Sequence, residues 1–266
     1  MPRHCSIIVT TYNRPSYLAL VLKSLGEQDY PKAYEVVVAD DGSEQPTAEI
    51  IAELAELMPY TLIHAWHEDR GFRAAAARNH AVSKSSGDYL IFLDGDCVVR
   101  PNFLSANDRL AQSGYMVCGR RVKLNESYSA QLLRRQELPP GDRSWLRRRL
   151  SGEIHSVLPL LYFPYFRYQQ ATKWRGVMTC NLGLWRHDFE KVNGFDETYV
   201  GWGDEDHDLA VRLLRCGVRR KEGRSDVPVI HLWHKKSDRA AKSRNRGRLE
   251  QVISADYTWA PVGLKK

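Results

Sequence analysis

The regular alternation of short apolar runs with amphipathic runs in the first half of the chain constrains the fold most. Apolar, β-branched runs are predicted to be buried strands at 5–11, 34–39, 60–66 and 88–93. Helices are predicted from Pro15, whose ring suits a first helical turn, and over 46–58, 73–85 and 101–112. Strands that alternate with helices favour an α/β fold with a Rossmann-like, mostly parallel central sheet and flanking helices.

Polar clusters follow three of these predicted strands, at 10–14, 40–43 and 94–96. The carboxyl ends of parallel strands meet at one edge of a sheet, where α/β proteins bind their ligands. In the last cluster Asp94 and Asp96 flank a glycine, and carboxylate oxygens are hard ligands suited to Mg²⁺ or Mn²⁺. An isolated Asp-Gly-Asp is often only a turn, but three clusters at one edge predict a ligand site.

Two of these polar features have competing interpretations. A carboxylate of Asp40 or Asp41 would accept hydrogen bonds from a uracil N–H or a ribose hydroxyl, whereas Asp41 or Ser43 would alternatively cap a helix. Arg78 would bind phosphate oxygens through its guanidinium fork, or it would be an ordinary charge on a helix surface. The residues alone leave both questions open.

The second half of the chain is less regular. Segment 124–175 is rich in arginine, proline and aromatic residues and carries no assignable pattern. Strands are predicted over 177–185 and 227–233 and a helix over 204–215, and the polar, basic tail from Ser237 is compatible with a helix.

Four acidic residues crowd the start of the predicted helix, within 204–208. Such crowding raises carboxylate pKa values and suits a general base, and an over-capped helix N-terminus is the alternative. Just before them Trp202 lies between two glycines and offers a flat face to a sugar ring. His231 and His234 would meet one metal ion if the chain turns there, or they are merely structural.

Composition and charge limit the cellular compartment and the classes of partner that we expect. No run reaches the ~20 apolar residues of a spanning helix, and the N-terminus reads as a strand rather than a signal peptide. The five cysteines show no CxxC pair and no zinc-like spacing, which fits reduced thiols in a cytosolic protein. The net charge of +7 suits polyanions such as nucleic acid, anionic lipid or a phosphorylated acceptor, with ordinary solubility charges as the alternative.

Three segments indicate a membrane surface. Arginines adjoin an aromatic, apolar run across 145–150 and 158–166, and 235–248 adds positive charge. We therefore expect a cytoplasmic protein that is peripheral at the inner, anionic face of the cytoplasmic membrane. The alternative is that 158–166 forms core beneath an acceptor site and that the basic tail binds a phosphorylated glycan.

In their order along the chain, these segments resemble family 2 glycosyltransferases, which have the GT-A fold. The matching motifs are Thr10-Thr11-Tyr12-Asn13-Arg14, Asp40-Asp41-Gly42-Ser43, Ala77-Arg78-Asn79 and Asp94-Gly95-Asp96. Later, 193–197 and 201–206 resemble the C-terminal galactosyltransferase-type module of β-1,4-galactosyltransferases, polypeptide GalNAc transferases and bacterial chondroitin-type polymerases. The resemblance covers about 5–236. It implies a nucleotide-sugar-binding half at 1–122, a smaller acceptor-binding and catalytic half at 123–236, and a basic tail at 237–266.

The resemblance also implies roles for single residues. Donor-binding residues would be Thr10, Thr11, Tyr12, Arg14, Asp40, Asp41, Arg73, Arg78, Asp94 and Gly95. Metal ligands for Mn²⁺ or Mg²⁺ would be Asp96, His234 and His231. Asp206 would be the catalytic base and Glu205 the acid that binds the acceptor, with Trp202, Gly203 and Asp204 beside them. The chain departs from the family at Asp204, where glycine is usual, and at His207, where an acid is usual, which leaves open which acid is the base.

The implied activity is an inverting, metal-dependent transfer of a hexose or N-acetylhexosamine. The donor would be a nucleotide sugar, with UDP expected, and the acceptor a glycan or lipid-linked glycan of bacterial surface polysaccharide or lipopolysaccharide, with no nucleic-acid partner. A nucleotidyltransferase acting on a sugar phosphate would show a glycine-rich basic loop where 10–14 stands. A non-catalytic nucleotide- or glycan-binding module is the third possibility.

Overall fold

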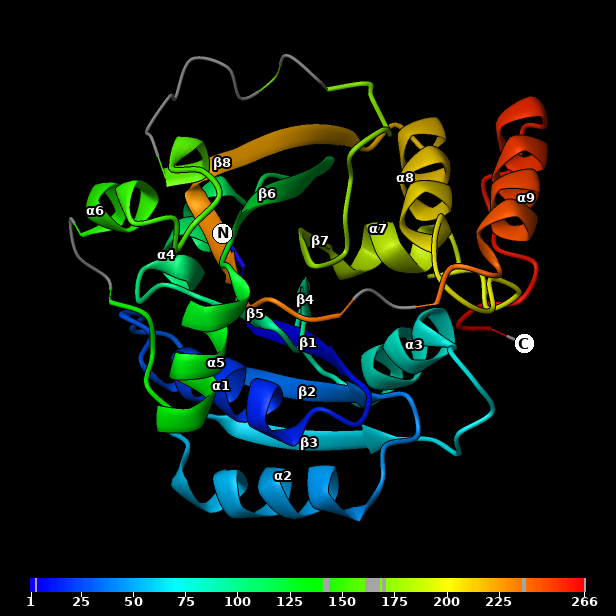
Figure 1. The fold of residues 1–266 in the computed structure, drawn as a ribbon. Helices are drawn as coiled ribbons and strands as arrows, with labels where there is room; N and C mark the ends of the chain where they lie inside the picture. Colours follow the sequence, from blue (N-terminus) through cyan, green and yellow to red (C-terminus); the bar gives the residue numbers. More distant parts are fainter. Residues whose placement is uncertain (3, 141–143, 161–167, 169–170, 236–237, 266) are drawn as a thin grey trace.

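The computed structural model describes residues 1–2, 4–140, 144–160, 168, 171–235 and 238–265. One sheet runs through the described chain, with strand order β3-β2-β1-β4-β7-β6-β8-β5 (Figure 1). The strands are β1 (Cys5–Thr11), β2 (Tyr34–Asp40), β3 (Thr61–Trp66), β4 (Tyr89–Asp94), β5 (Cys97–Val98), β6 (Tyr115–Lys123), β7 (Asn181–Trp185) and β8 (Arg219–His231).

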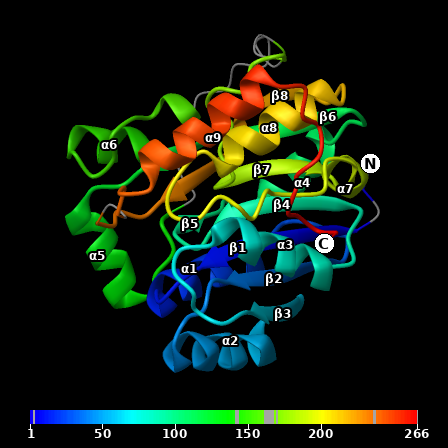
Figure 2. The same ribbon diagram turned by 90° about the vertical axis from the view of Figure 1, so that its right-hand side faces the viewer.

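Helices cover both faces of this sheet. They are α1 (Pro15–Gly26), α2 (Gln45–Leu57), α3 (Ala74–Lys84), α4 (Phe103–Leu110), α5 (Glu126–Arg135), α6 (Trp145–Leu150), α7 (Arg186–Lys191), α8 (Glu205–Arg215) and α9 (Lys242–Ser254), with a short 3-10 helix η1 (Leu158–Leu160). Alternate residues of β1 divide the core: Ile7 and Val9 pack with α1, α2, α4 and α5, whereas Ile8 packs with α3, α7 and α8. Helix α9 lies beside α8 on the outside (Figures 1 and 2).

The α/β class and the mostly parallel sheet are confirmed. β1 has the predicted bounds, β2 and β3 differ from prediction by one residue at one end, and β4 is shifted by one residue at both ends. β1 pairs in parallel with β2 and β4, β2 with β3, and β6 with β8. β7 enters antiparallel between β4 and β6, so a single sheet joins the first half of the chain to the second.

The second half differs from prediction in its strands. The strand expected over 177–185 begins only at Asn181, because turn hydrogen bonds to Trp174 and Met178 occupy the preceding residues. The strand expected over 227–233 begins already at Arg219, where it pairs with the unexpected strand β6. The start of β8 was not predicted as a strand because it carries charged residues. Arg220 and Glu222 are nevertheless buried there, since they form an ion pair of 2.6 Å.

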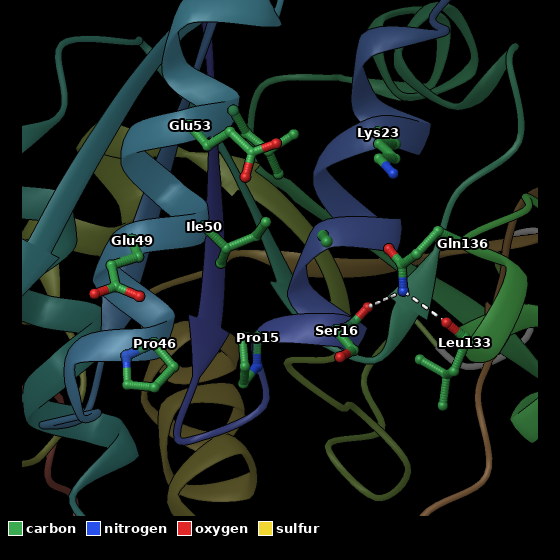
Figure 3. Close-up of a pocket in the computed structure, with 11 residues that line it drawn as sticks. Pro15, Ser16, Lys23, Pro46, Glu49, Ile50, Glu53, Leu133 and Gln136 are labelled. Carbon is green, nitrogen blue, oxygen red and sulfur yellow. Dashed lines mark hydrogen bonds between the residues drawn. The ribbon is translucent and has the colours of Figure 1, made fainter.

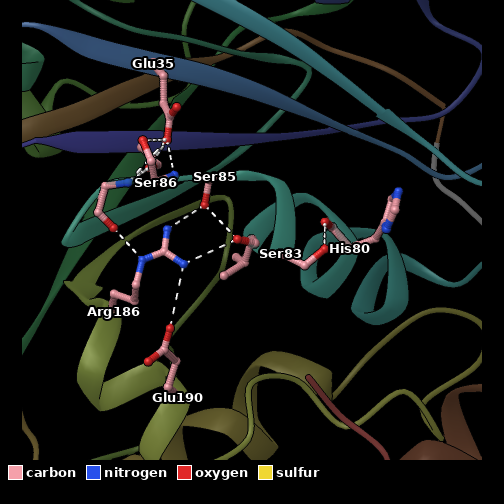
Figure 4. A network of polar contacts seen from close by, with 10 residues as sticks. Glu35, His80, Ser83, Ser85, Ser86, Arg186 and Glu190 are labelled. Carbon is pink, nitrogen blue, oxygen red and sulfur yellow. Dashed lines mark hydrogen bonds and ion pairs between the residues drawn. The ribbon is translucent and has the colours of Figure 1, made fainter. Parts of the chain in front are cut away.

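A polar network fixes the end of the sheet opposite the polar clusters (Figure 4). The guanidinium of Arg186 donates to the carbonyl of Gly87 at 2.5 Å and to the hydroxyl of Ser85 at 2.7 Å. Glu35 of β2 accepts from the N–H and hydroxyl of Ser86. The start of β4 is thereby held to β2 and to α7, and this anchors the strand that ends in Asp94.

The segments expected to contact a membrane are only partly described. Residues 145–150 form α6 and 158–160 form η1, whereas 161–166 lie outside the described residues. Within the described residues, every helix is too short or too polar to cross a bilayer.

Candidate active site

Backbone pairing brings the three predicted metal ligands together. The short strand β5 pairs antiparallel with the end of β8, which places Cys97 opposite His231. Next to this pair, the N–H of Leu232 donates to the carbonyl of Asp96 at 2.9 Å. One ligand atom from each of Asp96, His231 and His234 consequently lies within 4.8 Å of the others.

The turn that returns His234 to this site is held by two helices. The hydroxyl of Ser129 in α5 accepts the N–H of Trp233 at 2.8 Å. The hydroxyl of Tyr17 in α1 donates to the carbonyl of Trp233 at 3.0 Å. Nε2 of His234 is then 3.1 Å from the Asp96 carboxylate. Helix α5 therefore supports the site, although the sequence pattern did not reveal it.

The protonation states of these groups suit a divalent cation. Burial lowers the pKa of His231 to about 4, so its ring is neutral near pH 7 and offers a lone pair. Burial alone would raise the pKa of Asp96, but the hydrogen bond from His234 and the nearby His231 lower it overall. The same hydrogen bond raises the pKa of His234, so a metal would displace its proton. An ionised carboxylate with two imidazole nitrogens fits a first-row divalent metal.

The side chain of Arg78 lies between Asp94, at the end of β4, and Glu205, in the first turn of α8. Its side chain is 6% exposed, and its Nε donates to Thr10 Oγ1 at 3.0 Å. One terminal nitrogen lies 3.3 Å from Asp94 and the other 3.1 Å from Glu205. Arg78 is thus not a surface charge, because β1, β4 and α8 supply its partners, and its predicted contact with donor phosphate stays a prediction.

Gly95 is required by strand packing. Its N–H donates to the carbonyl of Thr10 at 2.8 Å, and an added Cβ would lie 2.9 Å from that oxygen. The glycine therefore lets Asp94 and Asp96 turn tightly around the end of β1. Burial raises the pKa of Asp94, which Arg78 opposes and Asp96 reinforces.

The carboxylates of Asp40 and Asp41 are engaged by protein groups. Asp40 accepts the N–H of Ser43 at 2.8 Å and contacts Nε2 of His64 at 2.8 Å. Asp41 contacts Nε2 of His67 at 2.8 Å and accepts the N–H of Arg73 at 2.7 Å. Arg73 is the N-cap of α3, so Asp41 stabilises the start of α3 rather than the start of the helix that follows it in sequence.

A loop after β3 closes over the same edge. The hydroxyl of Tyr12 donates to Asp69 at 2.8 Å, and Asp69 accepts the N–H of Gly71 at 2.9 Å. Gly42 has φ +89°, and any Cβ there would collide with the backbone of Asp69. Tyr12 nevertheless keeps 46% of its surface exposed, so its ring remains available to a base or ribose.

Two predicted donor-binding residues hold buried polar atoms without a protein partner in the described part of the chain. They are Oγ1 of Thr11 and Nε of Arg73. Buried polar atoms are almost always hydrogen-bonded in native proteins, to a ligand or water where protein is absent. These atoms are therefore consistent with a ligand at this sheet edge.

The acidic cluster forms the first turn of α8. Asp204 is the N-cap in a left-handed conformation, φ 72°, which glycine adopts without strain and other residues rarely adopt. Its carboxylate lies 2.9 Å from Nδ1 of His207. Asp206 keeps 19% of its side chain exposed, and burial followed by the charge of Glu205 raises its pKa to about 7.

The predicted acceptor-binding loop is covered by the C-terminal segment. The guanidinium carbon of Arg239 lies 4.6 Å from the ring centre of Trp202. Asp204 is 6% exposed and lies 3.3 Å from Arg246 of α9. Arg239 thus already contacts one face of the Trp202 indole, and Arg246 already pairs with the carboxylate of Asp204.

Several residues at the site were not predicted from the sequence. His64 lies within β3, and His67 and Asp69 follow it, but no polar cluster was singled out after this strand. Arg121 in β6 acts electrostatically on Asp94, Asp96 and His231, and β6 itself was not predicted. The carboxyl-end rule applied to β3 would have found His67 and Asp69.

Two surface grooves flank this edge. A groove of about 530 Å³ lies between α1, α2 and the end of α5, where the amide of Gln136 donates to the carbonyls of Ser16 and Leu133 (Figure 3). None of the predicted site residues line it. A second groove of about 460 Å³ beside α3 is lined partly by His67 and Arg73, next to the Asp41 turn.

Comparison with known proteins agrees with this architecture. Residues 6–191 match the pattern of glycosyl transferase family 2, and residues 161–235 match the N-terminal domain of galactosyltransferase. The chain is therefore a member of glycosyltransferase family 2. A similar protein is validoxylamine A glucosyltransferase of Streptomyces hygroscopicus subsp. limoneus, 29% identical over 229 residues, which cover 80% of this chain and 48% of that protein. The chain thus spans about half the length of this relative.

Solved structures share the fold. TarS 1–349 of S. aureus in complex with UDP-GlcNAc has a TM-score of 0.66 at 16% identity, covering 98% of this chain and 68% of that one. The mannosyltransferase PcManGT of Pyrobaculum calidifontis, in complex with GDP-Man and Mn²⁺, has a TM-score of 0.60 at 23% identity, covering 95% and 63%. The fold is that of the GT-A glycosyltransferases.

The raised pKa of Asp206 makes stability depend on pH. In the unfolded chain an aspartate titrates near pH 4, whereas folded Asp206 titrates near 7, so the folded state holds an extra proton between these values. Rising pH through this window therefore destabilises the wild type. We expect Asp206→Asn, which cannot ionise, to be more stable, with an advantage that grows from about pH 4 to about pH 7 and then levels off.

Urea unfolding of both proteins across this pH range measures the effect. Glu56→Gln, an exposed change on α2, is the control and should leave the pH profile unchanged. An advantage of Asp206→Asn that is constant with pH would contradict the shifted pKa.

Proposed function

We propose that this chain is a metal-dependent, inverting glycosyltransferase that moves a hexose or N-acetylhexosamine from a UDP-sugar to a hydroxyl of a glycan or lipid-linked acceptor. The observation that carries the proposal is the position of Arg78, which contacts Asp94 on one side and Glu205 on the other. These two carboxylates are close in sequence to the candidate metal ligand Asp96 and to the candidate base Asp206, so the contacts of one buried guanidinium support a common site. Family membership and neighbours that bind nucleotide sugars support the same activity.

The candidate metal ligands favour Mn²⁺ over Mg²⁺. Mg²⁺ prefers oxygen ligands and keeps much of its water, whereas Mn²⁺ accepts imidazole nitrogens alongside carboxylate. Asp96, His231 and His234 supply one oxygen and two nitrogens. When bound, the cation would neutralise charge on the diphosphate leaving group. Arg14, whose guanidinium lies 3.5 Å from Asp96, is close enough to bind the same phosphates.

Asp206 has the properties of the base. A pKa of about 7 matches the pH at which an acceptor hydroxyl must lose its proton, so the carboxylate is both ionised and basic enough there. Glu205 is held by Arg78, which fixes it to bind an acceptor hydroxyl. A hydroxyl deprotonated by Asp206 would attack the sugar carbon from the face opposite the diphosphate, and this single displacement inverts the anomeric centre.

The rival functions find less support in the geometry. A nucleotidyltransferase needs a phosphate-binding loop of free backbone N–H groups after the first strand, but there the N–H of Asn13 donates to the hydroxyl of Ser43 at 2.9 Å. A non-catalytic module would have no need of a carboxylate with the raised pKa of Asp206.

The setting we propose is bacterial surface polysaccharide synthesis at an anionic membrane. In the described structure Leu146 and Leu150, one turn apart on α6, are 63% and 81% exposed, and Leu158 is 70% exposed. The exposed side chains of Arg147 and Arg149 flank them. Exposed leucines beside arginines suit the headgroup zone of a bilayer. The membrane contact is therefore assigned to α6 and η1 rather than to the basic tail.

The metal site is tested with Asp96→Ala. The variant should lose about 10²-fold or more in transfer and should lose the rise in melting temperature that Mn²⁺ gives the wild type. Asp256→Ala, an exposed change near the C-terminal end, is the control. Activity within a few-fold of wild type, or activity indifferent to EDTA, would refute the metal site.

The base is tested with Asp206→Asn, which preserves shape and removes basicity. Turnover should fall by about 10²-fold or more while UDP affinity stays unchanged. The sugar transferred by the wild type should have the opposite anomeric configuration, read by proton NMR of the product. A large loss of UDP affinity with normal turnover would move Asp206 to donor binding.

Membrane association is tested by liposome co-sedimentation. Wild type should bind vesicles containing phosphatidylglycerol better than pure phosphatidylcholine, and less as salt rises. The double variant Leu146→Ser, Leu150→Ser should bind at least about 10-fold more weakly, because two apolar side chains no longer leave water. Leu57→Ser, at a leucine 66% exposed on α2, is the matched control. Equal binding to both lipids would contradict the proposal.

A further inference from the structure

The segment after residue 235 lies beyond both family matches, yet it builds one side of the predicted acceptor site. The buried amide of Asn245 in α9 donates to the carbonyls of Val200, Gly201 and Trp202 at 3.3, 3.4 and 3.5 Å. Arg244 donates to the carbonyl of Val200 at 2.7 Å. The loop that carries Trp202 is therefore held by groups that the family pattern does not include.

The loop and α9 also fit each other closely. Gly201 has φ +81°, and any Cβ there would collide with the side chain of Ala241. The guanidinium of Arg248 donates to the hydroxyl of Thr198 at 3.2 Å. These contacts position Arg239 relative to Trp202, since the carbonyl of Arg239 accepts the N–H of Lys242, the first residue of α9, at 3.0 Å.

Arg239 turns the aromatic platform of Trp202 into a cationic one. Its guanidinium stacks on the indole at 4.6 Å from the ring centre and is exposed to solvent. Within the described part of the chain it makes no side-chain hydrogen bond and no ion pair. A stacked guanidinium still presents its N–H groups around its edge, where they match the two oxygens of a carboxylate or phosphate.

The charges around this platform do not cancel. Arg246 is compensated by Asp204 at 3.3 Å. Asp238 keeps its negative charge while one oxygen accepts the N–H of Ala240 at 2.9 Å, and among the described residues it forms no ion pair with Arg239. The exposed side chains of Arg239 and Lys242 have no carboxylate partner among the described residues. A sugar hydroxyl needs no such excess of positive charge, whereas an anionic group does.

We propose that the acceptor carries an anionic oxygen group, a carboxylate or a phosphate, on the sugar unit next to Trp202, and that Arg239 binds it. This rests on the proposed function only in naming the ligand an acceptor. Arg239 is thus a specificity residue. The indole of Trp202 packs against the sugar ring or against the guanidinium of Arg239. The N–H groups at the edge of this guanidinium bind an anionic group in preference to a neutral one.

The test measures binding of small sugars to the full chain by saturation-transfer NMR, in the presence of UDP and the diamagnetic ion Mg²⁺. The probes are glucuronate, glucose 6-phosphate and glucose, which separate a carboxylate, a phosphate and a neutral sugar. At least one anionic probe should bind about 10-fold or more tightly than glucose, and the difference should shrink as salt rises. Whichever anion binds more tightly identifies the group.

Variants then assign the effect. Arg239→Gln should remove at least about 10-fold of the preference for the anion while leaving glucose and UDP binding unchanged. Arg239→Lys, which keeps the charge and loses the fork, should fall between wild type and Arg239→Gln. The matched control is Arg219→Gln, at an exposed arginine that begins β8, at the end of this strand opposite His231. It should behave as wild type.

The contrary outcomes are equally clear. Equal binding of all probes, no measurable binding of either anion, or an anion preference that survives Arg239→Gln would each overturn the proposal. A parallel loss of glucose binding in Arg239→Gln would make Arg239 a packing residue only. Because UDP binding is followed in the same samples, failure of the donor site would be seen separately.

Discussion

The rest of the site depends on the burial of one positive charge. Arg78 lies almost wholly out of water, and a buried guanidinium is tolerated only where carboxylates surround it. Burial by itself would lower the pKa of Arg78, but Glu205 and Asp94 raise it overall, so the group stays charged. Its three partners come from β1, β4 and α8, so its charge can be satisfied only when the two halves of the chain have come together.

This arrangement explains why carboxylates so close together do not all behave alike. Glu205 and Asp94 contact Arg78 directly, whereas Asp96 takes its stabilisation from His234 and His231. Asp206 sits beside Glu205 without a comparable partner, and its pKa is the one raised to about 7. Burial and the charge of Glu205 raise the pKa of Asp206 more than His207 and Arg78 lower it, which suits this carboxylate to exchange protons near neutral pH.

The first half of the fold was predictable because its strands are apolar and its turns are polar. β1 to β4 obey this rule, and their carboxyl ends carry Thr10, Asp41 and Asp94 as expected. The start of β8 does not obey it, because an internal ion pair between Arg220 and Glu222 replaces apolar side chains. A pattern based on hydrophobicity cannot show a strand whose burial depends on paired charges.

The site was predictable in its residue types and not in its contacts. That Asp96 and His231 are neighbours depends on pairing between β5 and β8, which are distant in sequence. The carboxylates of Asp40 and Asp41 look free in the sequence, yet His64, His67 and the start of α3 engage them. The side chain that stacks on Trp202, Arg239, lies in the basic tail. The composition of this tail shows that it is positively charged, but it does not show which residues its side chains contact.

The last described residues also have a consequence for how the protein is made. The amide of Asn193, just before the acceptor loop, donates to the carbonyl of Ala260 at 2.8 Å and accepts the N–H of Lys265 at 2.8 Å. Asn193 and Lys265 are 72 residues apart, which a ribosome takes roughly 4–14 s to add. Throughout that interval Asn193 lacks its contact with Lys265, although strands β1 to β4 have already been synthesised. The strands that end near Thr10, Asp41 and Asp94 are therefore made well before the C-terminal segment that holds Asn193 in place.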